Sequence, residues 1–258
     1  LIHLNQNGRI NLTDPFSGVA QLSGLQAIDS LPNEVGYDSQ VTIDWHFSVA
    51  NNEFYSAESS NHKIYRTLDT PSAHYHTVAH TACAGISETD ESNIVQQIWG
   101  KFAGLSMVNA FGFPMKYYGD YYSSTLAGLV LNGNGDCDAW AQFFQACLNV
   151  HKIGASYIQI FPGQSGFKIQ IKYLKVLYNM PGQNNPNPPR VFNYHAVSIY
   201  SNCIYDSSYG NIENIDGSFL AKLDYIFMER HVFLTYQLKS NKWVLIDKKS
   251  EQRKKIIK

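Results

Sequence analysis

Residues 133–150, GNGDCDAWAQFFQACLNV, place the strongest constraint on how this chain can fold. Five large side chains recur there at intervals of three and four residues: Trp140, Phe143, Phe144, Cys147 and Leu148. Such spacing puts them on one face of an α-helix. The glycines before them predict a tight turn at the start of the helix, and Gly154 predicts a stop after Lys152. We therefore expect a central helix that is buried against the rest of its domain.

One cysteine stands at the start of that helix, between two aspartates. Asp136 is a good N-cap, because its carboxylate can accept from the free N–H groups of the first turn. Cys137 then takes the first helical position, where these N–H groups and the helix dipole stabilise a thiolate. The charges of Asp136 and Asp138 oppose that stabilisation, so we expect an imidazolium partner from elsewhere in the chain.

Downstream of the helix the hydrophobic pattern changes to period two, which is typical of antiparallel strands. The expected strand segments are SYIQIF, FKIQIKYLKVLY, RVFNYHAVSIY and CIYDSSYG, with a two-residue turn at 201–202 between the last two. If that turn pairs Tyr200 with Cys203, the register extends along both strands. His195 and Asp206 then share one face of the sheet as diagonal neighbours, within reach of each other. A slip of one residue would separate them.

A cysteine that opens a helix, a histidine on a strand and an aspartate on the next strand have the roles of nucleophile, base and orienting group. The stretches GDCDAWAQFFQACLNVHKIGA, NYHAVSIY and YDSSYG resemble the transglutaminase-like superfamily, within the papain-like cysteine enzymes. The resemblance covers roughly residues 75–210 and implies a central helix packed on a sheet. It makes Cys137 the nucleophile, His195 the general base and Asp206 the residue that orients the base.

The chain departs from the pattern of that family in several places. The gap between the histidine and the aspartate is shorter than in the animal enzymes, and Ser198 stands where the family commonly has Trp. The aromatic partner of the oxyanion has no clear match. Tyr118 and Tyr122 are the candidates, beside the backbone N–H of Cys137. Asp216 is the alternative for the orienting carboxylate.

The other cysteines and a histidine cluster have simpler interpretations. Cys83, Cys147 and Cys203 have apolar neighbours and are expected to be core residues. In HYHTVAH, His76 and His80 are four residues apart and would share a helix face, as zinc ligands must. The glutamate of the metalloprotease pattern is missing, so we expect a polar helix entry there and no metal site.

The composition excludes several classes of partner. With 44% hydrophobic residues among 258, the chain can bury a large core without disulfides. The 20 Lys and Arg against 21 Asp and Glu give a formal net charge of −1, which argues against a nucleic-acid partner. The basic run KKSEQRKKIIK is expected to be a solvated end. No stretch approaches the roughly 18 apolar residues of a membrane span, and nothing assigns a compartment or an oligomeric state.

The composition changes near Pro71. Residues 1–70 are polar, with the alternating runs QVTIDWHFSV and HKIYRTL, and predict a small N-terminal β-rich unit. Residues 71–258 are expected to form a transglutaminase-like catalytic domain, in which PGQNNPNPP predicts an exposed loop. Thr89 or Asp90 caps a further helix in this domain. The apolar face of that helix comprises Ile94, Val95, Ile98, Trp99 and Phe102.

Together these features predict an α+β fold, with a papain-like or transglutaminase-like core after the N-terminal β unit. The resemblance implies a cysteine-dependent acyl-transfer enzyme that attacks an amide bond of a peptide or protein and forms a thioester. Hydrolysis is favoured over cross-linking, because selection of an amine needs a substrate tunnel that the sequence does not display. The alternative is a catalytically silent binding or scaffold module of the same fold. We expect neither a cofactor nor a metal in the reaction.

Overall fold

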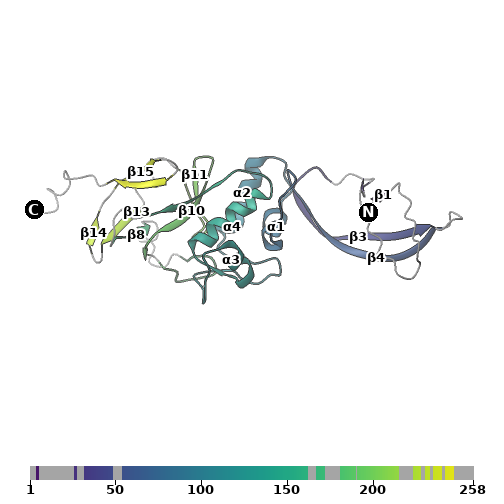
Figure 1. Cartoon of the computed structure of the whole chain (residues 1–258), viewed down its shortest axis with the longest axis horizontal. Coiled ribbons are helices and arrows are strands. Elements are labelled where there is room, and N and C mark those ends of the chain that lie inside the picture. Colours follow the sequence, from purple (N-terminus) through teal and green to yellow (C-terminus); the bar gives the residue numbers. More distant parts are fainter. Residues whose placement is uncertain are drawn as a thin grey trace, which may run out of the picture.

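The computed structural model has an α+β architecture, in which the helices lie beside antiparallel sheets (Figure 1). It describes residues 4–5, 26–27, 32–48, 54–161, 167–171, 181–189, 191–214, 223–227, 230–232, 235–239 and 242–246. The basic run at 248–258, Asp216 and the end of one predicted strand at 172–178 lie outside the described residues. The helices of the described part are α1 (His76–Cys83), α2 (Glu91–Ala103), α3 (Leu126–Asn132) and α4 (Cys137–Asn149).

The two longest of these helices, α2 and α4, bury the faces that the sequence predicts. Helix α2 begins after Asp90, whose carboxylate accepts the N–H of Asn93 at 3.0 Å. Helix α4 ends at Asn149, and Lys152 takes the left-handed conformation in the turn that follows, with φ 60°. The predicted stop at Gly154 is therefore wrong, because a residue nearer the helix makes the turn.

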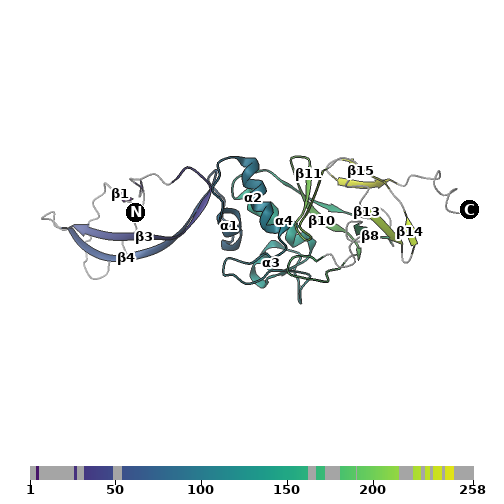
Figure 2. The same ribbon diagram turned by 180° about the vertical axis from the view of Figure 1, so that it is seen from behind.

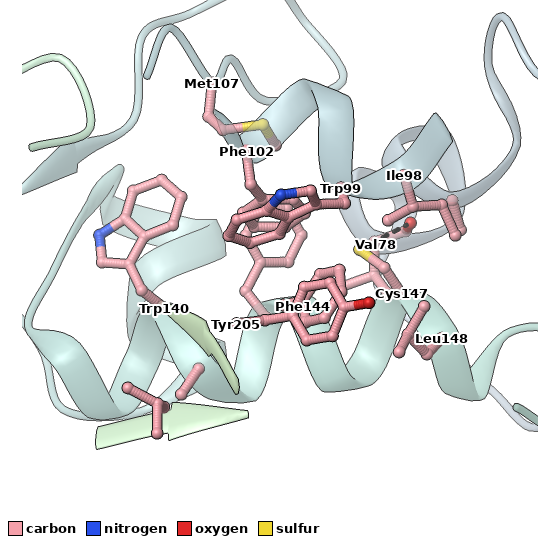
Figure 3. Packing of buried hydrophobic residues seen from close by; sticks show 14 of the residues in the cluster. Val78, Ile98, Trp99, Phe102, Met107, Trp140, Phe144, Cys147, Leu148 and Tyr205 are labelled. Atoms are coloured by element: carbon pink, nitrogen blue, oxygen red, sulfur yellow. Dashed lines mark hydrogen bonds between the residues drawn. The ribbon is translucent and has the colours of Figure 1, made fainter. Parts of the chain in front are cut away.

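The core lies where α2 and α4 meet the central sheet (Figure 3). The Trp99 ring packs edge-on against Phe144 and Tyr205, with centroids 5.4 and 5.0 Å away. Phe102 contacts Phe144 and Trp140 in the same manner, at 5.3 and 6.3 Å. All five side chains are buried. Aromatic rings bury large apolar areas and favour edge-to-face contacts, so this cluster fixes α4 against its neighbours.

The central sheet is antiparallel, with the strand order β12-β11-β10-β7. Its strands are β7 (Ser156–Ile160), β10 (His195–Tyr200), β11 (Cys203–Asp206) and β12 (Asn211–Asn214). Tyr200 pairs with Cys203, as predicted. The two turn residues between them, Ser201 and Asn202, have positive φ angles of 46° and 60°, as a type I′ turn requires. The predicted register is thus confirmed.

Helix α4 packs against β10. Ser198 is buried at this contact, and its hydroxyl donates to the Ala141 carbonyl of the helix at 2.9 Å. A small polar residue therefore joins the sheet to the helix at this position.

A long two-stranded hairpin extends away from the helices at one end of the molecule (Figures 1 and 2). It consists of β3 (Gly36–Ser48) and β4 (Phe54–Arg66), and the short strands β1 (Leu4–Asn5) and β2 (Gln26–Ala27) precede it. At its base Tyr37 stacks on Tyr65 at 4.8 Å and meets the His80 ring of α1 edge-on at 4.8 Å. Strands are therefore present where the N-terminal alternating runs predict them.

Further strands lie on the side of the helices opposite the hairpin (Figures 1 and 2). A second antiparallel sheet, in the order β14-β13-β8-β9, contains β8 (Phe167–Ile171), β9 (Val191–Phe192), β13 (Leu223–Phe227) and β14 (Arg230–Val232). A separate pair is formed by β15 (Thr235–Lys239) and β16 (Lys242–Ile246). Among the described residues, no helix has both the length and the apolar character needed to cross a membrane.

Candidate active site

Cys137 lies at the N-terminus of α4, in a capped first turn. Asp136 is the N-cap, and its Oδ1 accepts the N–H groups of Asp138 at 3.0 Å and Ala139 at 3.3 Å. The Ser124 hydroxyl donates to its other oxygen. Burial raises the pKa of Asp136, while these hydrogen bonds act in the opposite direction. The predicted cap is confirmed, and Cys137 itself is only 2% exposed.

The turn before α4 depends on two glycines. Gly133 follows α3 with φ 75°, a conformation that favours glycine. A Cβ on Gly135 would lie 2.8 Å from the Cβ of Ala139, so only glycine lets the chain pass this close to the helix. Gly135 belongs to β6 (Asn134–Gly135), which pairs in parallel with β5 (Lys116–Tyr117). That pairing brings a tyrosine-rich segment beside the cysteine.

His195 and Asp206 form a buried pair on neighbouring strands of the central sheet. His195 Nε2 and Asp206 Oδ2 are 2.7 Å apart, and the two residues are 0% and 1% exposed. The predicted shared face is confirmed. Burial by itself lowers the pKa of His195, but the charge of Asp206, its hydrogen bond and the Cys137 thiol raise it to about 10. An imidazolium beside the carboxylate is therefore the favoured form at neutral pH.

The second ring nitrogen of His195 has no competing partner. Nδ1 is buried, and within the described part of the chain no group meets hydrogen-bonding geometry with it. The ring packs against Phe192, whose centroid is 5.0 Å away, and Tyr209, at 5.9 Å, and these two rings also contact each other. Tyr209 is itself held by donation to the Pro189 carbonyl. These contacts fix the imidazole plane, while Cys137 is near enough to affect its protonation.

The two tyrosines considered for the oxyanion differ in position. Tyr118 is half-buried with φ 50°, and its N–H donates to the Gly135 carbonyl at 2.9 Å. Burial raises the pKa of Tyr118, and the charges of Cys137 and Asp136 raise it further, so its hydroxyl keeps the proton. The Tyr122 ring packs edge-on against Tyr118 at 4.6 Å but is 52% exposed. Tyr118 is thus the more buried of the two, and the one whose pKa is affected by the charge of Cys137.

Asp138 has partners that the sequence reasoning missed. It is 4% exposed, and its carboxylate accepts hydrogen bonds from the hydroxyls of Tyr157 and Tyr194. Gln159 Nε2 donates to the same carboxylate at 2.8 Å. These donors lie 19, 56 and 21 residues from Asp138 along the chain. No local pattern links them, because the pairing of β7 with β10 brings them together.

The segment 181–189, predicted to be an exposed loop, is built into the domain. Gln183 is 0% exposed, and its Nε2 donates to the carbonyls of Phe102 at 2.6 Å and Ser207 at 2.8 Å. The prediction of exposure is wrong for this residue, because its amide satisfies backbone carbonyls that would otherwise be buried without a donor.

The remaining cysteines differ in exposure. Cys83 and Cys147 are fully buried, as predicted, and burial raises the pKa of Cys83 to about 12 although the charge of Lys101 opposes it. Cys203 is half-buried at the start of β11, with Sγ 3.4 Å from Asn214 Oδ1. The expectation of a core position is wrong for Cys203, because it directly follows the exposed turn of the hairpin.

The histidine cluster lies on α1 and packs against the base of the hairpin. His76 and His80 have ring centroids 6.3 Å apart, and His76 lies 5.9 Å from the Tyr65 ring. Burial lowers the pKa of His80, and the charge of His76 acts in the same direction. Nowhere in the described ranges are three His, Cys, Asp or Glu side chains arranged to hold a metal ion.

No protein-family model, curated protein or solved structure matches this chain. The site itself combines a thiol at a helix N-terminus, an imidazole near it, and a carboxylate bonded to the far side of that imidazole. Such a set is suited to nucleophilic attack on a carbonyl carbon.

Proposed function

We propose that this protein is a cysteine-dependent acyl-transfer enzyme with a papain-like, transglutaminase-like core, acting on amide bonds of peptides or proteins. The observation that carries the proposal is the 2.7 Å contact between His195 Nε2 and Asp206 Oδ2. It leaves the other ring nitrogen for Cys137, the residue that opens α4. Cys137 is the nucleophile, His195 the general base, and Asp206 holds the base in one tautomer and orientation.

Acylation and deacylation each move one proton through His195. Before acylation His195 already holds the thiol proton as an imidazolium, and the Cys137 thiolate attacks the amide carbonyl carbon. The C–N bond breaks as the imidazolium gives that proton to the leaving amine, and a thioester remains on Cys137. In deacylation His195 takes a proton from water, whose oxygen attacks the thioester carbonyl. The C–S bond then breaks, the acid leaves, and the thiolate–imidazolium pair is restored.

The negative carbonyl oxygen of each tetrahedral intermediate needs donors. The Asp136 cap occupies the N–H groups of Asp138 and Ala139, and not that of Cys137. The backbone N–H of Cys137 is therefore one proposed donor. The hydroxyl of Tyr118, whose pKa is raised by burial and by the nearby negative charges, is the other.

Water is the proposed acyl acceptor, because transfer to an amine requires a site that selects the amine over water. A panel of glutaminyl and peptidyl amides, offered with and without an amine, tests this assignment. We expect the free acid as product from the wild type and no product from Cys137→Ala. A new amide that forms only when the amine is present would identify a cross-linking enzyme instead.

A binding or scaffold module of the same fold is the second candidate, and one observation favours it. Cys137 is 2% exposed and His195 is 0% exposed, so little of either residue meets solvent directly. Under this alternative the thiol is an ordinary core cysteine without enhanced reactivity.

Alkylation at controlled pH separates the two candidates. We expect iodoacetamide, a small neutral reagent, to modify Cys137 first and to do so below pH 7, where an ordinary cysteine with a pKa of about 8.5 is almost wholly protonated. In His195→Ala the stabilising cation is lost, so the curve of alkylation rate against pH moves to higher pH. Mass mapping of the labelled peptides measures both proteins.

The half-buried Cys203 serves as an internal reference in this experiment, because it is the most accessible of the other cysteines. If Cys203 is labelled before Cys137, or if His195→Ala leaves the curve unchanged, the acyl-transfer proposal fails.

A further inference from the structure

Asp138 is a buried carboxylate that the proposed reaction does not use. It follows the cysteine on the first turn of α4, and its carboxylate is bonded to two tyrosine hydroxyls and one glutamine amide. A buried charge is tolerated only when partners replace its hydration. Three donors from the sheet side meet that requirement here, so the contact is a specific one between the helix and the sheet.

The three donors lie on or directly beside two adjacent strands of the central sheet. Tyr157 and Gln159 belong to β7, and Tyr194 immediately precedes β10. Strands β7 and β10 pair, with Gln159 opposite Ala196. The carboxylate therefore joins the start of α4 to two adjacent strands at one end of their ladder.

The same two chain segments carry the proposed nucleophile and base. Cys137 and Asp138 are neighbours at the start of α4, and Tyr194 and His195 are neighbours at the start of β10. The contact of Asp138 with Tyr194 thus lies one residue from each partner of the thiol–imidazole pair. Any change in that contact shifts the backbone that carries the imidazole relative to the backbone that carries the sulfur.

We propose that Asp138, bonded to Tyr157, Gln159 and Tyr194, is a positioning residue that sets the distance and orientation of His195 relative to Cys137. This inference rests on the proposed function and assigns Asp138 no contact with the substrate. Hydrogen bonds to a charged, buried acceptor are stronger than neutral ones and are directional. Displacement of a catalytic group by about 1 Å is enough to lower a rate substantially.

The tyrosine donors keep their protons throughout the working range of pH. Burial raises the pKa of Tyr157, and its hydrogen bond to Asp138 raises it further. The same two causes, in the same order, raise the pKa of Tyr194. The two hydroxyls therefore remain donors near neutral pH, and we take their contribution to be geometric.

The test uses Tyr194→Phe, which removes one donor and keeps the ring. Tyr200→Phe is the matched control, because the Tyr200 hydroxyl also donates to a carboxylate, that of Glu91 at 2.8 Å, on an exposed surface. Tyr157→Phe is a second variant, which removes another donor and leaves the charge of Asp138 beside Cys137 unchanged. The readout is the curve of Cys137 alkylation rate against pH, with thermal unfolding measured on the same samples.

We expect Tyr194→Phe and Tyr157→Phe to lower the alkylation rate at pH 6 by roughly tenfold or more and to move the curve toward that of His195→Ala. Tyr200→Phe should retain the wild-type curve. If Tyr194→Phe lowers only the unfolding temperature and keeps the wild-type curve, Asp138 is merely structural and the inference is overturned. If instead the wild type already shows the curve of His195→Ala, the proposed function fails, and this outcome is distinct from the first.

Discussion

Asp206 is held at both of its carboxylate oxygens. Oδ2 meets His195 Nε2 at 2.7 Å, and Oδ1 accepts the N–H of Ser208 at 3.2 Å. A carboxylate held in this way fixes which imidazole nitrogen carries hydrogen and which one is directed elsewhere. The orientation of the base is thus decided by one residue on the neighbouring strand.

Asp206→Asn should preserve the fold but lower turnover by about 10³- to 10⁴-fold on any amide that the wild type hydrolyses, since an amide can bind the imidazole in the wrong tautomer. Steady-state rates of purified wild type and variant measure the effect. Asp90→Asn is the control, because Asn serves equally well as the N-cap of α2. A variant at 206 with wild-type kinetics would remove Asp206 from the mechanism.

The segment 181–189 stabilises the fold as a helix or strand would, although it contains neither a helix nor a regular strand. Its side-chain amides replace the hydrogen bonds that a ladder would supply. Asn185 donates to the Tyr117 carbonyl at 2.7 Å, while Gln183 reaches the end of α2 and the segment that follows β11. Residues 181–189 therefore connect β5, which lies beside Cys137, to the central sheet that carries His195.

Gln183→Leu should lower the free energy of unfolding by about 2–4 kcal/mol, because the side chain keeps a similar volume while two carbonyls lose their buried donor. Urea unfolding measures the loss. Gln97→Leu makes the same substitution at a partly buried site with one bond, Nε2 to Glu88 Oε1 at 3.0 Å, and should cost less than about 1.5 kcal/mol. Equal losses of unfolding free energy in the two variants would contradict this stabilising role of Gln183.

The molecule as a whole is nearly neutral, with a formal net charge of −1, yet it buries several ionisable groups together. Asp136, Asp138, His195 and Asp206 are each at most 4% exposed. Buried charges are stable only when paired or hydrogen-bonded. The stability of the whole fold is therefore linked to the protonation of its candidate site.

In Cys137→Ser, where no thiol proton offsets that of His195, we expect the free energy of unfolding to fall as pH rises from 6.5 toward 10. The folded state keeps a proton on His195 up to its raised pKa of about 10, whereas the unfolded state releases this proton near 6.5. Stability from this proton is complete below 6.5 and declines above it, by up to about 1.4 kcal/mol per pH unit. Urea unfolding between pH 6.5 and 8.5 measures the slope.

Asp206→Asn, added to Cys137→Ser, should lose most of this slope, because the charge that raises the pKa of His195 is gone. The window stops at pH 8.5 because Cys83, with a pKa raised to about 12, adds a decline of the same sign at higher pH. Parallel slopes in the single and double variants would show that the His195–Asp206 pair does not control this dependence.

The sequence by itself determined the features that depend on neighbouring residues. The apolar spacing in α4, the Asp136 cap and the type I′ turn at 201–202 are local, so their residue types indicate them directly. Because a two-residue turn fixes the register of its strands, the meeting of His195 with Asp206 also followed from the sequence.

Only the tertiary structure decided which distant segments share a buried polar group. Asp138 meets Tyr194 across 56 residues, and Gln183 meets Phe102 across 81. In the sequence, Asp138 beside a cysteine and Gln183 in a proline-rich segment look like ordinary solvent-facing polar residues. No local pattern distinguishes either of them from such residues. Their burial follows from the packing of α4 and α2 against the sheet, which brings in the donors and carbonyls that make burying them favourable.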